Sequence, residues 1–147
     1  MSENFYAQPL EPKLYSSESI LIATFFGGPL VGGYLIAENF KIMGELEKAK
    51  QTWVFAILGI SLLLGFVEFI KNISTFWYII PLTYTAMTYL PMKWLQGNKI
   101  KAHMLQGGQM HKGDRVFVIS FVGAVASMVG LLFMSIMMQI ATTGDVS

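Results

Sequence analysis

Two histidines and one carboxylate are the residues of this chain whose types best suit metal chemistry. His103 and His111 are eight residues apart, and Asp114 follows three residues later. Zinc sites need three or four ligands at characteristic spacings, and these three residues lie in a glycine-interrupted stretch. The chain contains no cysteine, which excludes disulfides, thiolate metal sites and thiol nucleophiles. We therefore expect no metal site and no cofactor.

Catalytic signatures are also missing from the sequence. There is no nucleophile elbow, no phosphate-binding loop with the Walker spacing and no HExxH motif. The formal net charge is +1, so the chain lacks the basic field that nucleic-acid binding requires. We expect no catalytic residues, no enzyme activity and no nucleic-acid partner.

Polar and helix-breaking residues within apolar stretches indicate a second kind of chemistry, the passage of an ion or a proton. An ionisable side chain in a membrane span is costly and often functional, and a broken helix offers free carbonyls to an ion. The candidates for such a path are Pro29, Glu68, Pro81, Thr85 and Thr88. Two simpler interpretations stay open: Glu68 pairs with Lys71 at the membrane interface, and the hydroxyls bond to backbone carbonyls.

Four apolar stretches must position these residues. Hydrophobic residues make up 54% of the 147-residue chain and charged residues 13%, a balance that one soluble core cannot bury. The stretches cover 19–40, 52–70, 76–90 and 116–141, after a polar tail at 1–18, and Pro91 is expected to end the third. The sequence thus predicts an all-α, polytopic membrane protein. It forms a single domain over 1–147, with four transmembrane helices and an interfacial segment between helices 3 and 4.

Small residues recur on three of the four stretches and predict close helix packing. In the first stretch, Pro29 is expected to bend the helix and to leave the carbonyl of Phe25 without its helical donor. The expected packing residues are Gly28, Gly32, Gly33, Ser61, Gly65, Gly123, Ser127 and Gly130.

Basic residues are divided unequally between the connections. Loops 41–51 and 92–115 carry eight of them, whereas the termini and the short connection between the second and third stretches carry two, Lys13 and Lys71. Because cytoplasmic loops are enriched in lysine and arginine, this predicts cytoplasmic loops and both termini outside.

The first stretch also resembles a family. The segments Gly27-Gly28-Pro29-Leu30, Gly32-Gly33-Tyr34-Leu35 and Glu38-Asn39-Phe40 resemble the first helix of uncharacterised small bacterial multi-pass membrane proteins. The resemblance covers about a fifth of the chain. It implies a location in the bacterial cytoplasmic membrane and no particular activity.

Two functions follow from these patterns. The first is a non-catalytic membrane subunit or scaffold, surrounded by lipid, that packs through glycine-rich helix faces as a homo-oligomer or with other membrane subunits. The alternative is an oligomeric channel, pore-forming effector or small transporter that uses the polar path residues. A chain this short needs several copies to enclose a pore.

Overall fold

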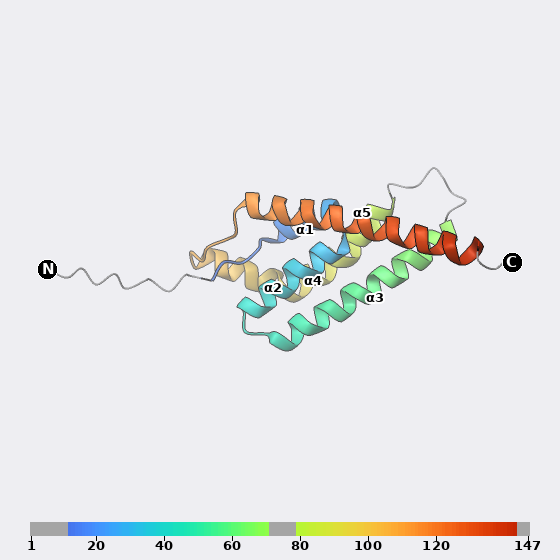
Figure 1. Ribbon diagram of the computed structural model, residues 1–147. Coiled ribbons are helices and arrows are strands. Elements are labelled where there is room, and N and C mark those ends of the chain that lie inside the picture. Colours follow the sequence, from blue (N-terminus) through green and yellow to red (C-terminus); the bar gives the residue numbers. More distant parts are fainter. Residues whose placement is uncertain (1–11, 71–78, 144–147) are drawn as a thin grey trace.

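The computed structural model of this protein is all-α, as the sequence predicts (Figure 1). It describes residues 12–70 and 79–143, without the side chains of 63–70 and of several α5 positions beyond Gly130. Five helices and no strand are present in this part of the chain. They are α1 (Ser17–Gly27), α2 (Pro29–Ile42), α3 (Leu46–Ile70), α4 (Ile79–Leu105) and α5 (Gly113–Thr143).

The first apolar stretch folds back on itself, so the prediction of a single spanning helix over 19–40 is wrong. The side chain of Asn39 accepts a hydrogen bond from the Tyr15 amide at 2.8 Å and donates one to the Tyr15 carbonyl at 2.9 Å. A continuous helix would hold residues this far apart in sequence about 36 Å from each other. Helices α1 and α2 therefore form an antiparallel hairpin with its tip at Gly28.

Local chemistry at the tip explains the reversal. Gly28 has φ +84°, a conformation that side chains with a Cβ rarely adopt, and its amide donates to the Thr24 carbonyl to close α1. Pro29 then opens α2, where its missing N–H leaves no bond unmade. At the other end, the Ser16 side chain caps α1 by accepting from the Ser19 amide. The Ser16 cap, the positive φ of Gly28 and the proline at the start of α2 are therefore all accommodated by two short helices in place of one long helix.

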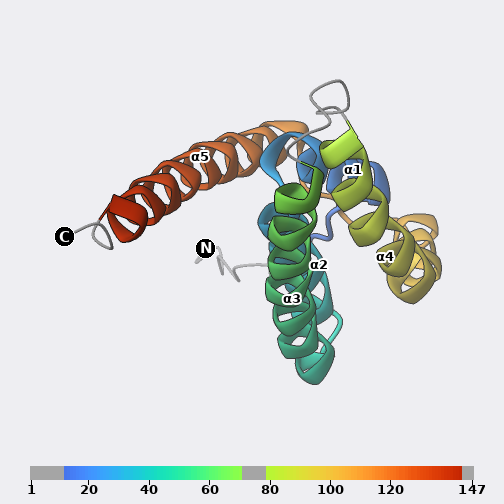
Figure 2. The same ribbon diagram turned by 90° about the vertical axis from the view of Figure 1, so that its right-hand side faces the viewer.

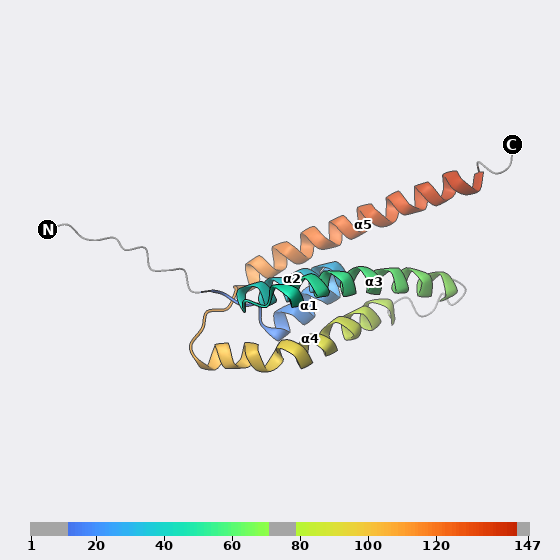
Figure 3. The same ribbon diagram turned by 90° about the horizontal axis from the view of Figure 1, so that it is seen from below.

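The hairpin forms the centre of the protein, and α3, α4 and α5 pack around it. Most of the buried apolar residues belong to it or to its flank, among them Tyr15, Ile20, Leu35 and Phe40. The chain direction alternates from each helix to the next, as the views in Figures 1 and 3 show. Gly28, at the break between the two helices, is buried.

Helix α4 continues through Pro91 to Leu105, so the expected helix end at residue 90 is wrong. The interfacial location of the segment between the third and fourth stretches stays a prediction. An interior proline removes one hydrogen bond and destabilises a helix by about 3 kcal/mol. Met92, Gln96 and Ile100, one turn apart, are all buried, and their burial offsets this loss. The expected turn at 107–108 is present, with φ +79° at Gly107.

The other expected stretches lie within longer helices. Helix α3 begins at Leu46, six residues before the stretch 52–70, after a turn with φ +77° at Gly44. Within the described residues α4 begins at Ile79, and residues 76–78 lie outside them, as do the expected link at 72–75 and Lys71.

Helix α5 starts beside the amino-terminal segment and then leaves the bundle (Figures 2 and 3). The Leu14 amide donates to the Gln109 carbonyl, and the His111 amide donates to the Leu14 carbonyl. The 31 residues of α5 then extend about 46 Å away from this contact. The described amino-terminal segment and the end of α5 therefore lie at opposite ends of the molecule, which does not fit two termini on one side of a membrane.

Among the described residues, α5 is the one helix that meets both the length and the hydropathy expected of a membrane span. Its segment Gly113–Gly130 has a mean hydropathy of 1.4, and 11% of the residues in this segment are buried. Helix α1 is apolar but shorter.

Candidate functional site: the hairpin tip and the basic end

The hairpin tip is held by a side chain from α4. Pro29 leaves the carbonyl of Phe25 without a helical donor, as the sequence predicts, and the Tyr84 hydroxyl donates to this carbonyl at 2.8 Å. Tyr84 is 59 residues away in sequence, so the bond ties the tip to α4. A freed carbonyl inside an apolar bundle is thereby satisfied by the protein itself.

Hydroxyls gather around the same region, and most of them bond within their own helix. Thr24 donates to the Ile20 carbonyl, Thr88 to the Tyr84 carbonyl and Ser120 to the Val116 carbonyl, at 2.7 to 2.8 Å. The exception is Thr85, whose buried Oγ1 has no hydrogen-bond partner. Of the expected polar path, Thr85 and Thr88 thus lie on α4 near the tip, and only Thr85 has an unused hydroxyl.

Close packing at the hairpin depends on four glycines. A Cβ at Gly32 would overlap Thr24 Oγ1 and lie 2.8 Å from Thr88 Cγ2, and one at Gly33 would lie 2.8 Å from the Ala56 Cβ. A Cβ at Gly123 would overlap the side chain of Val31. A Cβ at Gly27, which was not among the expected packing residues, would lie 3.0 Å from the backbone of Ser120. These contacts bring α3, α4 and α5 against the hairpin.

Other expected packing residues make no such contact with the residues that the structure describes. Nothing lies within 4 Å of a Cβ at Gly130, and Ser61 is exposed with its hydroxyl bonded to the Ile57 carbonyl. Gly28 serves the turn, and the hydroxyl oxygen of Ser127 lies 3.6 Å from the position of its Cβ.

The remaining expected path and packing residues are Pro29, Pro81, Glu68 and Gly65. Pro29 begins α2 at the tip, whereas Pro81 lies half-buried in the first turn of α4. The side chain of Glu68 and the surroundings of Gly65 lie outside the described residues.

Two buried amide side chains were missed from the sequence. Asn39 is fully buried and closes the hairpin, while Gln96 is fully buried and donates from Nε2 to the Ile36 carbonyl at 2.9 Å. The Oε1 atom of Gln96 is buried without a partner. An uncharged amide within a periodic apolar pattern is the signal that could have identified both residues.

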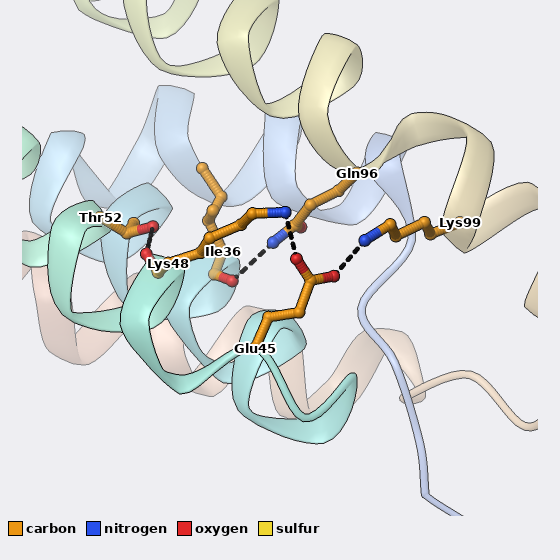
Figure 4. A network of polar contacts seen from close by, with 6 residues as sticks. All are labelled: Ile36, Glu45, Lys48, Thr52, Gln96 and Lys99. Atoms are coloured by element: carbon orange, nitrogen blue, oxygen red, sulfur yellow. Dashed lines mark hydrogen bonds and ion pairs between the residues drawn. The ribbon is translucent and has the colours of Figure 1, made fainter.

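The end of the molecule that carries the α2–α3 and α4–α5 turns is basic. Glu45 accepts hydrogen bonds from both Lys48 and Lys99, which links α3 to α4 (Figure 4). These bonds hold the pKa of the Glu45 carboxyl below its usual range. One carboxylate between two ammonium groups leaves one positive charge uncompensated.

The two histidines contact other residues at the same end. The ring of His111 packs on Tyr15 with 4.3 Å between centroids, and His103 Nε2 lies 3.2 Å from the Gln109 carbonyl. Burial lowers the pKa of His111, and the positive charges of Arg115 and Lys13 lower it further. In the part of the chain that the structure describes, no three metal-ligating side chains come together.

Comparison with family models, curated proteins and solved structures finds no match to this chain. The resemblance of the first apolar stretch to small bacterial membrane proteins therefore stays a prediction.

Proposed function

We propose that this chain is a multi-pass membrane protein that acts as a non-catalytic subunit and self-associates through the outer half of α5. The observation that carries the proposal is the exposure of that half. From Met128 to Ile140, every side chain that the structure describes is exposed. A helix this apolar needs lipid or other helices around it.

The distribution of charge supports a membrane location for the whole bundle. The hairpin tip, α3 from Gln51 to Val67, α4 up to Met92 and α5 from Val116 carry no Asp, Glu, Lys, Arg or His. Large apolar side chains on α3, α4 and α5 are exposed over the same length. This charge-free, apolar exterior matches the hydrocarbon layer of a bilayer, which is about 30 Å thick.

The hairpin supports a particular orientation. Helix α1 is about 16 Å long, so the tip reaches about halfway into the hydrocarbon layer and the chain returns to the face it entered from. Eight of the ten basic residues then lie on that face: Lys13, Lys41, Lys48, Lys50, Lys99, Lys101, Lys112 and Arg115. The positive-inside rule favours a cytoplasmic amino terminus, and α3, α4 and α5 as three spans place the carboxyl terminus outside.

Self-association is tested by counting copies of the chain in mild detergent by native mass spectrometry. No atom of the described residues lies within 4 Å of the position of a Cβ at Gly130, so this glycine offers a close approach to a helix from a second copy. We expect wild type to form oligomers and Gly130→Leu to lose them. The matched control is Gly59→Leu on α3, where a Cβ also meets nothing, and it should assemble as wild type does. A wild-type protein that is strictly monomeric at all concentrations contradicts the proposal.

A second function, an oligomeric channel or small transporter, is favoured by one observation, the unpartnered hydroxyl of Thr85 close to a broken helix. Half-helix ends and free polar groups at membrane depth are typical of ion and substrate sites. Against it, Tyr84 already satisfies the Phe25 carbonyl, and the neighbouring hydroxyls bond to their own backbone.

Ion flux through liposomes separates the two functions. The channel interpretation predicts flux that falls in Thr85→Val and in Glu68→Gln. Absence of flux at every protein density would exclude it and would leave the subunit proposal standing.

A further inference from the structure

The basic end contains a cavity of about 340 Å³ between the amino-terminal segment, the end of α2 and the end of α4. Its lining is amphiphilic. Pro12, Leu14, Ile42, Met43 and Ala102 supply apolar walls, and Lys99, His103 and Gln106 supply polar groups along one side. A cavity with this division of surfaces suits a ligand that has both a polar head and an apolar body.

The charge beside the cavity selects an anionic head. Lys99 lines the cavity with its side chain about half exposed, and it shares the Glu45 carboxylate with Lys48 (Figure 4). Two ammonium groups on one carboxylate leave an excess positive charge at the cavity. Among the described residues at this end of the molecule, eight basic residues outnumber five acidic ones, Glu18, Glu38, Glu45, Glu47 and Asp114. Phosphate oxygens are the acceptors that such a lysine binds most readily.

We propose that this cavity binds the phosphate headgroup of an anionic membrane phospholipid, with the upper acyl chain against the apolar walls. The inference rests on the proposed membrane location, because the cavity then lies at the cytoplasmic leaflet, where anionic lipids face basic residues. Lys99 and Gln106 donate hydrogen bonds to the phosphate, and Leu14, Ile42 and Met43 contact the chain.

The test uses the full-length protein in vesicles of equal parts phosphatidylglycerol and phosphatidylcholine. After extraction in mild detergent, native mass spectrometry counts the lipids that stay bound. We expect wild type to retain phosphatidylglycerol in preference to phosphatidylcholine. Lys99→Gln should weaken this preference about fivefold, the effect of one basic residue near an anionic surface. Equal retention of the two lipids by wild type overturns the proposal.

Two further variants separate the cavity from general charge. Lys50→Gln removes a lysine from an exposed Lys–Glu pair at the same end but away from the cavity, and it should behave as wild type. Ala102→Trp fills the cavity without changing charge or the Glu45 pairs, and it should lose the lipid as Lys99→Gln does. Unchanged retention in Ala102→Trp contradicts the assignment to this cavity.

Two controls identify the source of any failure. Flotation of the protein with the vesicles tests the membrane location itself. A protein that does not float overturns the proposed function, whereas one that floats without lipid preference overturns only the lipid site. Displacement of the lipid by millimolar glycerol phosphate would show a site for free phosphates and would refute the lipid assignment.

Discussion

The hairpin closure through Asn39 gives the sharpest stability prediction. Asn39 is fully buried, and its amide satisfies both the N–H and the C=O of Tyr15, at 2.8 and 2.9 Å. Asn39→Leu keeps a branched side chain of similar size but removes both bonds. Two buried backbone groups then lose their partners.

The magnitude follows from the desolvation of those groups. An unsatisfied buried polar group destabilises a protein by about 1–3 kcal/mol, so Asn39→Leu should lower the free energy of unfolding by about 2–6 kcal/mol. This is a large share of the 5–15 kcal/mol that stabilises a typical domain. The hairpin should therefore open before the rest of the bundle unfolds.

Denaturant titration in mild detergent, followed by circular dichroism, measures the loss, and hydrogen exchange at the start of α1 locates it. The matched control is Asn98→Leu, the same substitution at an exposed α4 position, which should stay within about 0.5 kcal/mol of wild type. If Asn39→Leu is as stable as Asn98→Leu and exchanges no faster, the closure of the hairpin by this side chain is refuted.

Three further predictions concern packing, hydrogen bonding and pH. Gly32→Ala places a Cβ against Thr24 and Thr88 and should cost about 1–3 kcal/mol by denaturant titration, whereas Gly59→Ala, which meets nothing, should be neutral or stabilising. Tyr84→Phe removes the bond to the Phe25 carbonyl and should lower the free energy of unfolding by about 1 kcal/mol or more; an unchanged value would mean that water replaces the hydroxyl. Burial lowers the pKa of His111 in the folded protein, so below about pH 6.5 the unfolded chain binds more protons than the folded one. The free energy of unfolding should therefore fall as the pH drops from about 6.5 through the lowered pKa. Thermal unfolding from pH 7.5 to 5 should show this slope in wild type and less of it in His111→Phe, which keeps a ring against Tyr15; equal slopes would contradict the assignment.

Local patterns in the sequence located the helices but not the path of the chain between them. All four apolar stretches overlap helices within the described residues, and the turn at 107–108 lies where its glycines predict. The pair Gly28–Pro29 permits either a bent spanning helix or a reversal. The reversal depends on the contact of Asn39 with Tyr15, which are far apart in the chain, and spacing alone does not reveal such a contact.

Other differences also have a tertiary origin. Pro91 is a strong stop signal, yet burial of Met92 and Gln96 against the hairpin carries α4 past it. Small residues at helical spacing predicted packing faces, and the pattern did not distinguish Gly32, which packs inside the chain, from Gly130, which meets nothing there. The expectation that hydroxyls of the third stretch bond to backbone carbonyls is confirmed for Tyr84, which donates to the Phe25 carbonyl.

Membrane-impermeant thiol labelling of single-cysteine variants tests the re-entrant hairpin most directly. The native chain has no cysteine, so Lys13→Cys and Lys50→Cys each carry one reactive thiol, before and after the hairpin. In intact cells we expect both positions to be protected, and in inverted membrane vesicles we expect both to be labelled. Labelling of Lys13→Cys and Lys50→Cys from opposite faces of the membrane would mean that the first apolar stretch crosses it, and this would contradict the account.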